Sequence, residues 1–307
     1  MDSMTQLTVF FREVYRPLKL RGKSANTTRL YEATFASMRR LIGREPTIGD
    51  ISDDLTVTRY LELLSTTVSG RTGRRLSPYT VEKQRTQICA MARLAFDRGI
   101  LTGARLAIAP ETLPERTPEA WTHEEMVRVF DAAKSANGRI GKLLTSAVMP
   151  ALISFIYDTG ERVTACLEAL RDDYHRPHCL VRAEARKGKK KDKLFRLSDE
   201  TCDLLDAIVV PSSPMLITIP PSQRARIWPI FGEIVEAAGL AGGRSSKFHK
   251  IRRTVASAYA AAGQDSSALL GHSSKRITER YYLDPKITGG PPAPCDVLQR
   301  LGKPHAK

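Results

Sequence analysis

Residues 248–282, FHKIRRTVASAYAAAGQDSSALLGHSSKRITERYY, are the stretch from which fold and chemistry are best argued. An α-helix turns about 100° per residue, so the first half predicts a helix with one apolar stripe and an opposite basic face formed by His249, Arg252 and Arg253. Gly263 is expected to end this helix, and a second helical segment follows Gly271. The predicted apolar stripe consists of Ile251, Val255, Ala258, Tyr259 and Ala262.

The same stretch ends in two adjacent tyrosines, and Tyr281 lies nine positions after His272. A phenol is mostly protonated at neutral pH, so it becomes a nucleophile only beside cations or a base. Nearby arginines would favour its charged form, and His249 or His272 could accept its proton. Adjacent helical residues face about 100° apart, so we expect one of Tyr281 and Tyr282 to point into a site and the other to pack in the core.

Four sequence boxes, in a fixed order, carry a family resemblance. His-x-x-Arg at 249–252, Leu-Gly-His at 270–272 and then Tyr281 resemble the C-terminal signature of the tyrosine recombinases, or phage integrase family. DTGERVTACLEAL, residues 158–170, places an arginine two residues after a glycine, where that family has its first catalytic arginine. VRAEARKGKKKDKLFRL, residues 181–197, resembles the family's β-hairpin, whose turn carries a lysine. The resemblance therefore implies a phosphodiester-cleaving site.

The resemblance implies that Arg162, His249, Arg252 and His272 are catalytic and that Tyr281 is the nucleophile. Cleavage of a phosphodiester needs cations on its non-bridging oxygens, and a guanidinium offers a planar fork that meets two oxygens at once. The alternative for Arg162 is an ordinary surface arginine, ion-paired with Glu161 or Glu168. Departures from the family pattern lie beside this set: Ala165 stands where many relatives have an acidic residue, and Arg253 where many have a second histidine.

The lysine-rich turn should supply the proton that the leaving oxygen needs. By resemblance the catalytic lysine precedes the turn glycine, Gly188, which selects Lys187. The loop is one residue longer than the commonest family form, so Lys189 remains an alternative. The other basic residues are predicted to contact DNA phosphates. This predicted DNA-binding set is Arg186, Lys189, Lys190, Lys191, Lys193 and Arg253.

Composition agrees with a nucleic-acid partner. A net charge of +15 over 307 residues favours binding to a polyanion, because Lys and Arg contacts to phosphates release counterions. A basic membrane-surface protein is the competing interpretation, but the sequence has no long apolar run and no signal peptide, so we expect a cytoplasmic protein. The five cysteines form no Cys-x-x-Cys pair, and no nucleotide-binding Gly-rich loop is present. We therefore expect neither metal nor cofactor.

The chain is expected to be mainly α-helical, with one small β-hairpin around residues 179–197. Residues 1–105 resemble the SAM-like, helical core-binding domain of the family, with helices predicted within 24–43 and 77–99. Three prolines among residues 106–121 indicate a linker, and 122–285 form the predicted catalytic domain. The tail, 286–307, would either dock on a neighbouring protomer or fray.

As a whole, the resemblance implies a site-specific DNA recombinase in an Xer-like, two-domain arrangement, such as an integrase of a mobile element. Its implied partners are double-stranded DNA, three further copies in a homotetramer on two DNA sites, and accessory proteins that set direction. Its implied chemistry is DNA cleavage and rejoining through a 3′-phosphotyrosyl intermediate. Two alternatives remain open from the sequence: a non-catalytic DNA-binding regulator on the same fold, and a type IB topoisomerase-like enzyme that relaxes DNA.

Overall fold

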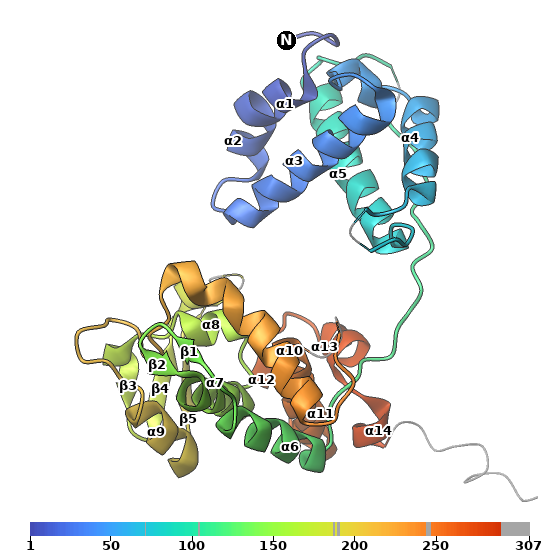
Figure 1. Cartoon of the computed structure of the whole chain (residues 1–307). Coiled ribbons are helices and arrows are strands. Elements are labelled where there is room, and N and C mark those ends of the chain that lie inside the picture. Colours follow the sequence, from blue (N-terminus) through green and yellow to red (C-terminus); the bar gives the residue numbers. More distant parts are fainter. Residues whose placement is uncertain (71, 104, 187, 189–190, 244–246, 290–307) are drawn as a thin grey trace, which may run out of the picture. The chain divides into compact units, whose positions relative to one another are not determined.

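The chain divides into two compact units, Met1–Glu115 and Arg116–Lys307. The computed structural model describes residues 1–289 except 71, 104, 187, 189–190 and 244–246 (Figure 1). The division lies within the segment predicted as a linker. Within the described ranges, no helix combines the length and the apolar character needed to cross a bilayer.

The first unit is a helical bundle around an aromatic core (Figure 1). Phe11 stacks on Tyr31 with ring centroids 5.0 Å apart, and the hydroxyls of Tyr15 and Tyr31 are 2.9 Å apart. Both predicted helices are confirmed: α3 ends where Gly43 adopts a φ of 75°, and α5 begins at Pro78. The elements are α1 (Leu7–Phe10), η1 (Phe11–Tyr15), α2 (Arg16–Lys19), α3 (Ala25–Ile42), η2 (Ile48–Ile51), α4 (Asp54–Thr66) and α5 (Pro78–Asp97).

The second unit is built around α7 (Thr145–Thr159), which packs against α6 (His123–Lys134), α9 (Asp199–Asp206) and α11 (Phe248–Ala261). Apolar residues on every side of α7 are buried, because it lies between these helices. Its C-terminal end therefore fixes the position of the segment that follows. The remaining helices are α8 (Val163–Leu167), η3 (Arg171–Asp173), η4 (Ala183–Ala185), η5 (Pro221–Arg226), α10 (Ile227–Ala237), α12 (Ser266–Leu270), α13 (Lys275–Tyr282) and α14 (Pro285–Thr288).

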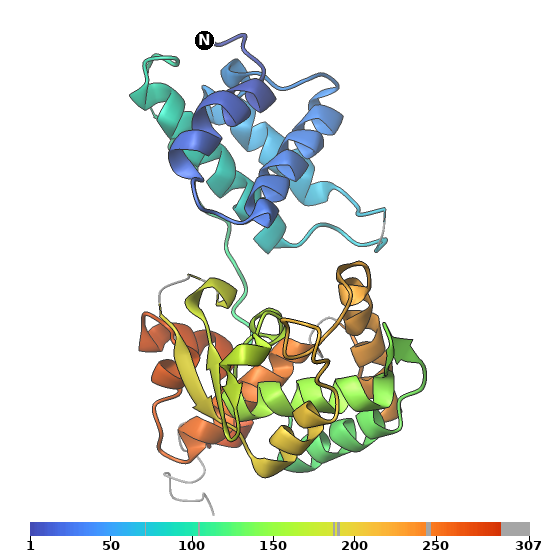
Figure 2. The same cartoon turned by 90° about the vertical axis from the view of Figure 1, so that its left-hand side faces the viewer.

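The second unit also contains two small antiparallel sheets, β1 (Arg139–Ile140) with β2 (Leu143–Leu144), and β3 (Tyr174–His175), β4 (His178–Val181) and β5 (Lys193–Arg196) in that order. Figure 2 shows β4 and β5 in yellow-green. The predicted hairpin is confirmed as the pair β4 and β5, with Val181 opposite Lys193. The first strand is shorter than predicted, because a 3-10 turn begins at Ala183, and the third strand was not predicted.

The predicted two-faced pattern of α11 is partly wrong. Ile251 is buried as expected, but Tyr259 is 39% exposed and Arg252 only 1% exposed. The reason is that α11 packs against α7 on one side and against α12, α13 and α14 on others, so it has no single solvent-facing side. A cation that the periodicity assigns to the surface is thereby enclosed.

Candidate active site

A cavity of about 1060 Å³ brings together segments that are far apart in the sequence. Arg162, at the start of α8, lines it together with side chains of the hairpin and of α11 to α13. Lys187, Lys189 and Lys190 lie outside the described residues. The predicted site residues that line the cavity are Arg162, Arg186, Lys191, Lys193, His249, Arg253, His272 and Tyr281.

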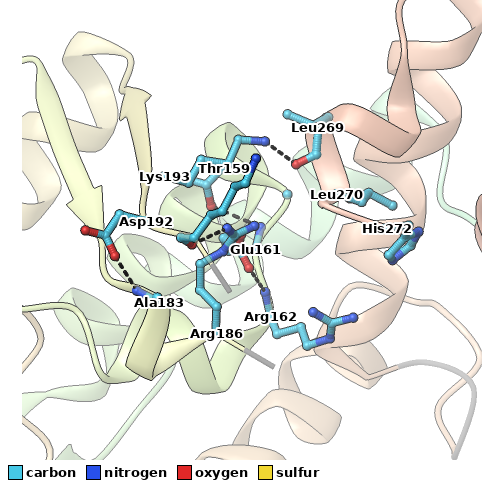
Figure 3. Close-up of polar contacts among 12 residues, drawn as sticks. Thr159, Glu161, Arg162, Ala183, Arg186, Asp192, Lys193, Leu269, Leu270 and His272 are labelled. Atoms are coloured by element: carbon cyan, nitrogen blue, oxygen red, sulfur yellow. Dashed lines mark hydrogen bonds and ion pairs between the residues drawn. The ribbon is translucent and has the colours of Figure 1, made fainter. Parts of the chain in front are cut away.

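Arg162 offers the cavity an unoccupied guanidinium. Its backbone is held where α7 ends: Gly160 adopts a φ of 61°, and a Cβ there would lie 3.2 Å from Val255 of α11. Its side chain extends toward His272 (Figure 3) and makes no hydrogen bond or ion pair with any residue in the described part of the chain. Glu168 pairs instead with Arg224. The guanidinium is therefore available to an anion.

Arg252 is buried beneath the cavity, and its guanidinium contacts two helix ends. Nη1 donates to the carbonyl oxygen of Gly160, after α7, and Nη2 donates to that of Leu270, at the end of α12, at 2.9 Å. Nη1 is also 3.6 Å from the carboxylate of Glu161. The Nε of Arg252 is buried and has no hydrogen-bond partner among the described residues. Burial, together with the charge of Arg162, lowers the pKa of Arg252.

Both predicted histidines have lowered pKa values. The pKa of His249 is lowered to about 4, first because surrounding groups displace water from the ring, although the residue as a whole is exposed, and then by the charges of Arg253 and Arg252. The pKa of His272 is also lowered to about 4, first by burial and then by Arg252. Nη2 of Arg252 lies 3.4 Å from Nε2 of His272, and Nδ1 lies 2.8 Å from Oγ1 of Thr278. Since arginine only donates, we assign the His272 proton to Nδ1.

The two tyrosines at the end of α13 differ in burial. Tyr281 is 49% exposed, and its carbonyl oxygen accepts a hydrogen bond from Arg253 at 3.1 Å. Tyr282 is 6% exposed, and its ring centroid lies 5.0 Å from that of His249 and 4.5 Å from that of His272. Tyr282 therefore packs, as expected. Both side chains nevertheless line the cavity, unlike the expectation that only one faces it, because the cavity extends around the end of α13.

Several predicted DNA contacts are engaged within the chain. Nζ of Lys193 donates to the carbonyl oxygens of Ala268 and Leu269 (Figure 3), and the pKa of Lys193 is lowered by burial and by Arg186. Nε of Arg186 is 2.7 Å from the carboxylate of Glu161. Lys191 is exposed.

Glu161 is the residue whose importance the sequence did not reveal. It was considered only as a partner of Arg162, but its ion pairs are with Arg186 and Arg252. The available signal was a carboxylate placed directly between a helix-ending glycine and Arg162. Within the described residues, no group of three or more His, Cys, Asp or Glu side chains is arranged to hold a metal ion.

Comparisons place this geometry among known proteins. The model of the phage integrase family matches residues 119–286. In structure, the chain is similar to lambda integrase (residues 75–356), a dimer bound to a COC′ core site, with a TM-score of 0.66 and 17% identity over 89% of this chain and 97% of that one. A lambda integrase tetramer bound to a Holliday junction gives a TM-score of 0.65 and 18% identity over 88% of this chain and 78% of that one.

The integrase of the Tn1549 transposon, in complex with a circular intermediate DNA, gives a TM-score of 0.63 at 13% identity, over 91% of this chain and 95% of that one. At such identities the similarity shows the fold. No curated protein sequence matches the chain.

Proposed function

Because this chain belongs to the phage integrase family, we propose that it is a site-specific DNA recombinase that cleaves and rejoins DNA through a 3′-phosphotyrosyl intermediate. The observation that best supports this is the composition of the cavity. The guanidinium of Arg162, which has no partner in the described part of the chain, faces the same space as two imidazoles of lowered pKa and an exposed phenol, that of Tyr281. This set can bind a phosphate and attack it.

In the proposed reaction the phenol oxygen of Tyr281 attacks the phosphorus, and the bond to the 5′ oxygen breaks. His249 or His272, neutral at physiological pH, accepts the phenol proton. The positive charges of Arg162 and Arg252 stabilise the phosphorane-like transition state, Arg252 from a buried, fixed position and Arg162 from the open cavity, where the phosphate itself orders the guanidinium. Lys187 gives a proton to the leaving 5′ oxygen. The phosphotyrosyl bond retains the energy of the broken phosphodiester, so a new 5′-hydroxyl can reverse the step.

The proposed assembly is a homotetramer on two double-stranded DNA sites. Support comes from the structurally similar lambda integrase, which is described as a dimer on a core site and as a tetramer on a Holliday junction. The net charge of +15 suits binding to the phosphate backbone. Accessory directionality proteins would add to this complex.

The test is covalent capture. Duplexes selected from a random pool by binding to the purified chain are rebuilt with a nick just 3′ of the scissile phosphate, so that the short fragment bearing the new 5′-hydroxyl is lost after cleavage. We expect a DNA adduct that survives detergent, with the phosphoryl group on Tyr281 by mass spectrometry. Binding without adduct would indicate a DNA-binding regulator instead. Relaxation of a supercoiled plasmid without the selected site, at low enzyme ratio, would indicate the topoisomerase-like alternative.

A further inference from the structure

Glu161 contacts two arginines that come from different parts of the second unit. Its carboxylate is 1% exposed, and Oε1 lies 2.7 Å from Nε of Arg186 (Figure 3). Oε2 lies 3.6 Å from Nη1 of Arg252. Oε2 also accepts the backbone N–H of Arg162 at 3.3 Å. One buried carboxylate therefore contacts the residue before the lysine-bearing turn and both arginines proposed to act on the phosphate.

Arg186 extends this connection across the turn. Its Nη1 donates to the carbonyl oxygen of Lys191 at 2.9 Å, so the guanidinium links positions 186 and 191, which flank residues 187–190 in the sequence. Its Nη2 packs against Gly271, where a Cβ would lie only 2.9 Å away, next to His272. The backbone of Lys191 is thus tied to Arg186, and Arg186 is tied to Glu161.

The charges require such a partner. Arg162, Arg186 and Arg252 gather around one cavity, and like charges at short range repel one another. A carboxylate among them offsets this repulsion, and burial of the carboxylate is tolerated because it is paired on both oxygens. Many members of the family resembled have an acidic residue three positions after the first arginine, where this chain has Ala165. In this chain the carboxylate comes instead from Glu161, the residue directly before Arg162.

We propose that Glu161 is a positioning residue that couples the placement of the lysine-bearing turn to the placement of Arg252. The proposal rests on the proposed function and adds to it a defined link between the proton donor and the phosphate-binding arginine. Glu161 acts through Arg186 on the turn and directly on Arg252, and it does not touch the DNA.

The experiment measures single-turnover cleavage of the selected, nicked duplex by Glu161→Gln, Arg186→Lys and the double variant. Each is measured with an ordinary 5′ oxygen and with a 5′-bridging sulfur, whose thiolate leaves without a proton. We expect Glu161→Gln to cut cleavage of the oxygen substrate by roughly 100-fold, as a misplacement of about 1 Å can do. The sulfur substrate should recover part of this loss, and Arg186→Lys, which cannot span Glu161 and Lys191, should be recovered nearly in full.

On the oxygen substrate, the cleavage rate of the double variant should be no lower than that of Glu161→Gln alone, because both substitutions remove the same Glu161–Arg186 contact. Glu168→Gln is the matched control, since Glu168 pairs with Arg224 outside the cavity, and it should cleave like the parent chain. The coupling would be overturned if the two substitutions reduced the cleavage rate independently, so that their effects multiplied in the double variant. It would also be overturned if the sulfur substrate restored cleavage in neither single variant. If Glu161→Gln does not fold, Glu161→Asp, which keeps the charge but shortens the reach to Arg186, takes its place in the same comparison. Failure of the parent chain to form any adduct would instead overturn the proposed function.

Discussion

The two sides of the cavity are stabilised in different ways. On the buried side, Arg252 and Glu161 have almost no exposed surface and are held by carbonyl oxygens and by each other. On the open side, the Arg162 guanidinium has no partner among the described residues and Tyr281 is half exposed. In the proposed mechanism, one phosphate-binding arginine is therefore fixed by the interior of the protein and the other is left for the substrate to fix. Substitutions on the buried side should affect stability and chemistry together, whereas those on the open side should affect chemistry alone.

The largest effect is expected for the exposed phenol. Tyr281→Phe should reduce the covalent DNA adduct below detection while DNA affinity and the melting temperature stay within error, because the ring is on the open side. Tyr282→Phe is the control, since it keeps the buried ring and its contacts to both imidazoles. An adduct that persists in Tyr281→Phe and disappears in Tyr282→Phe would transfer the nucleophile to Tyr282.

The two arginines provide the most direct test of the comparison. Arg162→Lys and Arg252→Lys should each slow single-turnover cleavage by about 100-fold or more, because an ammonium cannot reproduce the planar fork. Only Arg252→Lys should also lower the free energy of unfolding, by about 1–3 kcal/mol, because the carbonyls of Gly160 and Leu270 lose donors. Urea unfolding of both variants measures the free energy of unfolding. An equal decrease in Arg162→Lys would contradict the claim that only the buried side of the cavity stabilises the fold.

The lysines between positions 187 and 191 provide a test of the proton donor. Lys187→Ala should cleave poorly and recover on the 5′-bridging sulfur substrate, whereas Lys190→Ala and Lys191→Ala should each reduce the slope of log affinity against log salt by about 1. Recovery of Lys189→Ala in place of Lys187→Ala would show that the longer loop has moved the proton donor.

Lys193 lies on the same hairpin but should behave differently. Because its Nζ donates to two carbonyl oxygens near the end of α12, Lys193→Met should lower the melting temperature more than it changes the salt slope. Lys191→Met, at an exposed position nearby, is the matched control. A salt slope that falls as in Lys191→Met, with no loss of stability, would return Lys193 to the predicted phosphate contacts.

A further expected effect concerns the dependence of stability on pH. Both site histidines have pKa values of about 4, below the usual 6.5, so the unfolded chain binds more protons than the folded chain between these values. Their contribution to stability is complete above pH 6.5 and is lost as the pH falls toward 4. Urea unfolding from pH 4.5 to 7.5 should show this slope, and it should be weaker in His272→Gln than in His175→Gln, a strand residue outside the cavity. An equal slope in both variants would contradict the assigned shift.

The sequence predicted those features whose signals are local. Helix ends follow from residues such as Gly43 and Pro78, and the motif order identified the side chains that gather around the cavity. The burial of Arg252 was missed, because helical periodicity treats a cation as solvent-facing and contains no information about carbonyls contributed by α7 and α12. The pairing of Glu161 with Arg186 was missed for the same reason: it depends on segments that meet only in the folded chain. The two-residue strand β3 is too short to show a periodicity.

Because Arg252 donates hydrogen bonds to the ends of two helices, the same side chain stabilises the fold and takes part in the proposed catalysis. A descendant of this chain that survived only as a DNA-binding protein would still need Arg252 to keep its catalytic unit folded. The side chains of Arg162 and Tyr281 are not needed to stabilise the fold. Once recombination was no longer selected, substitutions at these two positions would therefore not be removed by selection. Among diverged copies, Arg252 should therefore persist longest, and the joint presence of Arg162 and Tyr281 should be the better sign that a copy is still active.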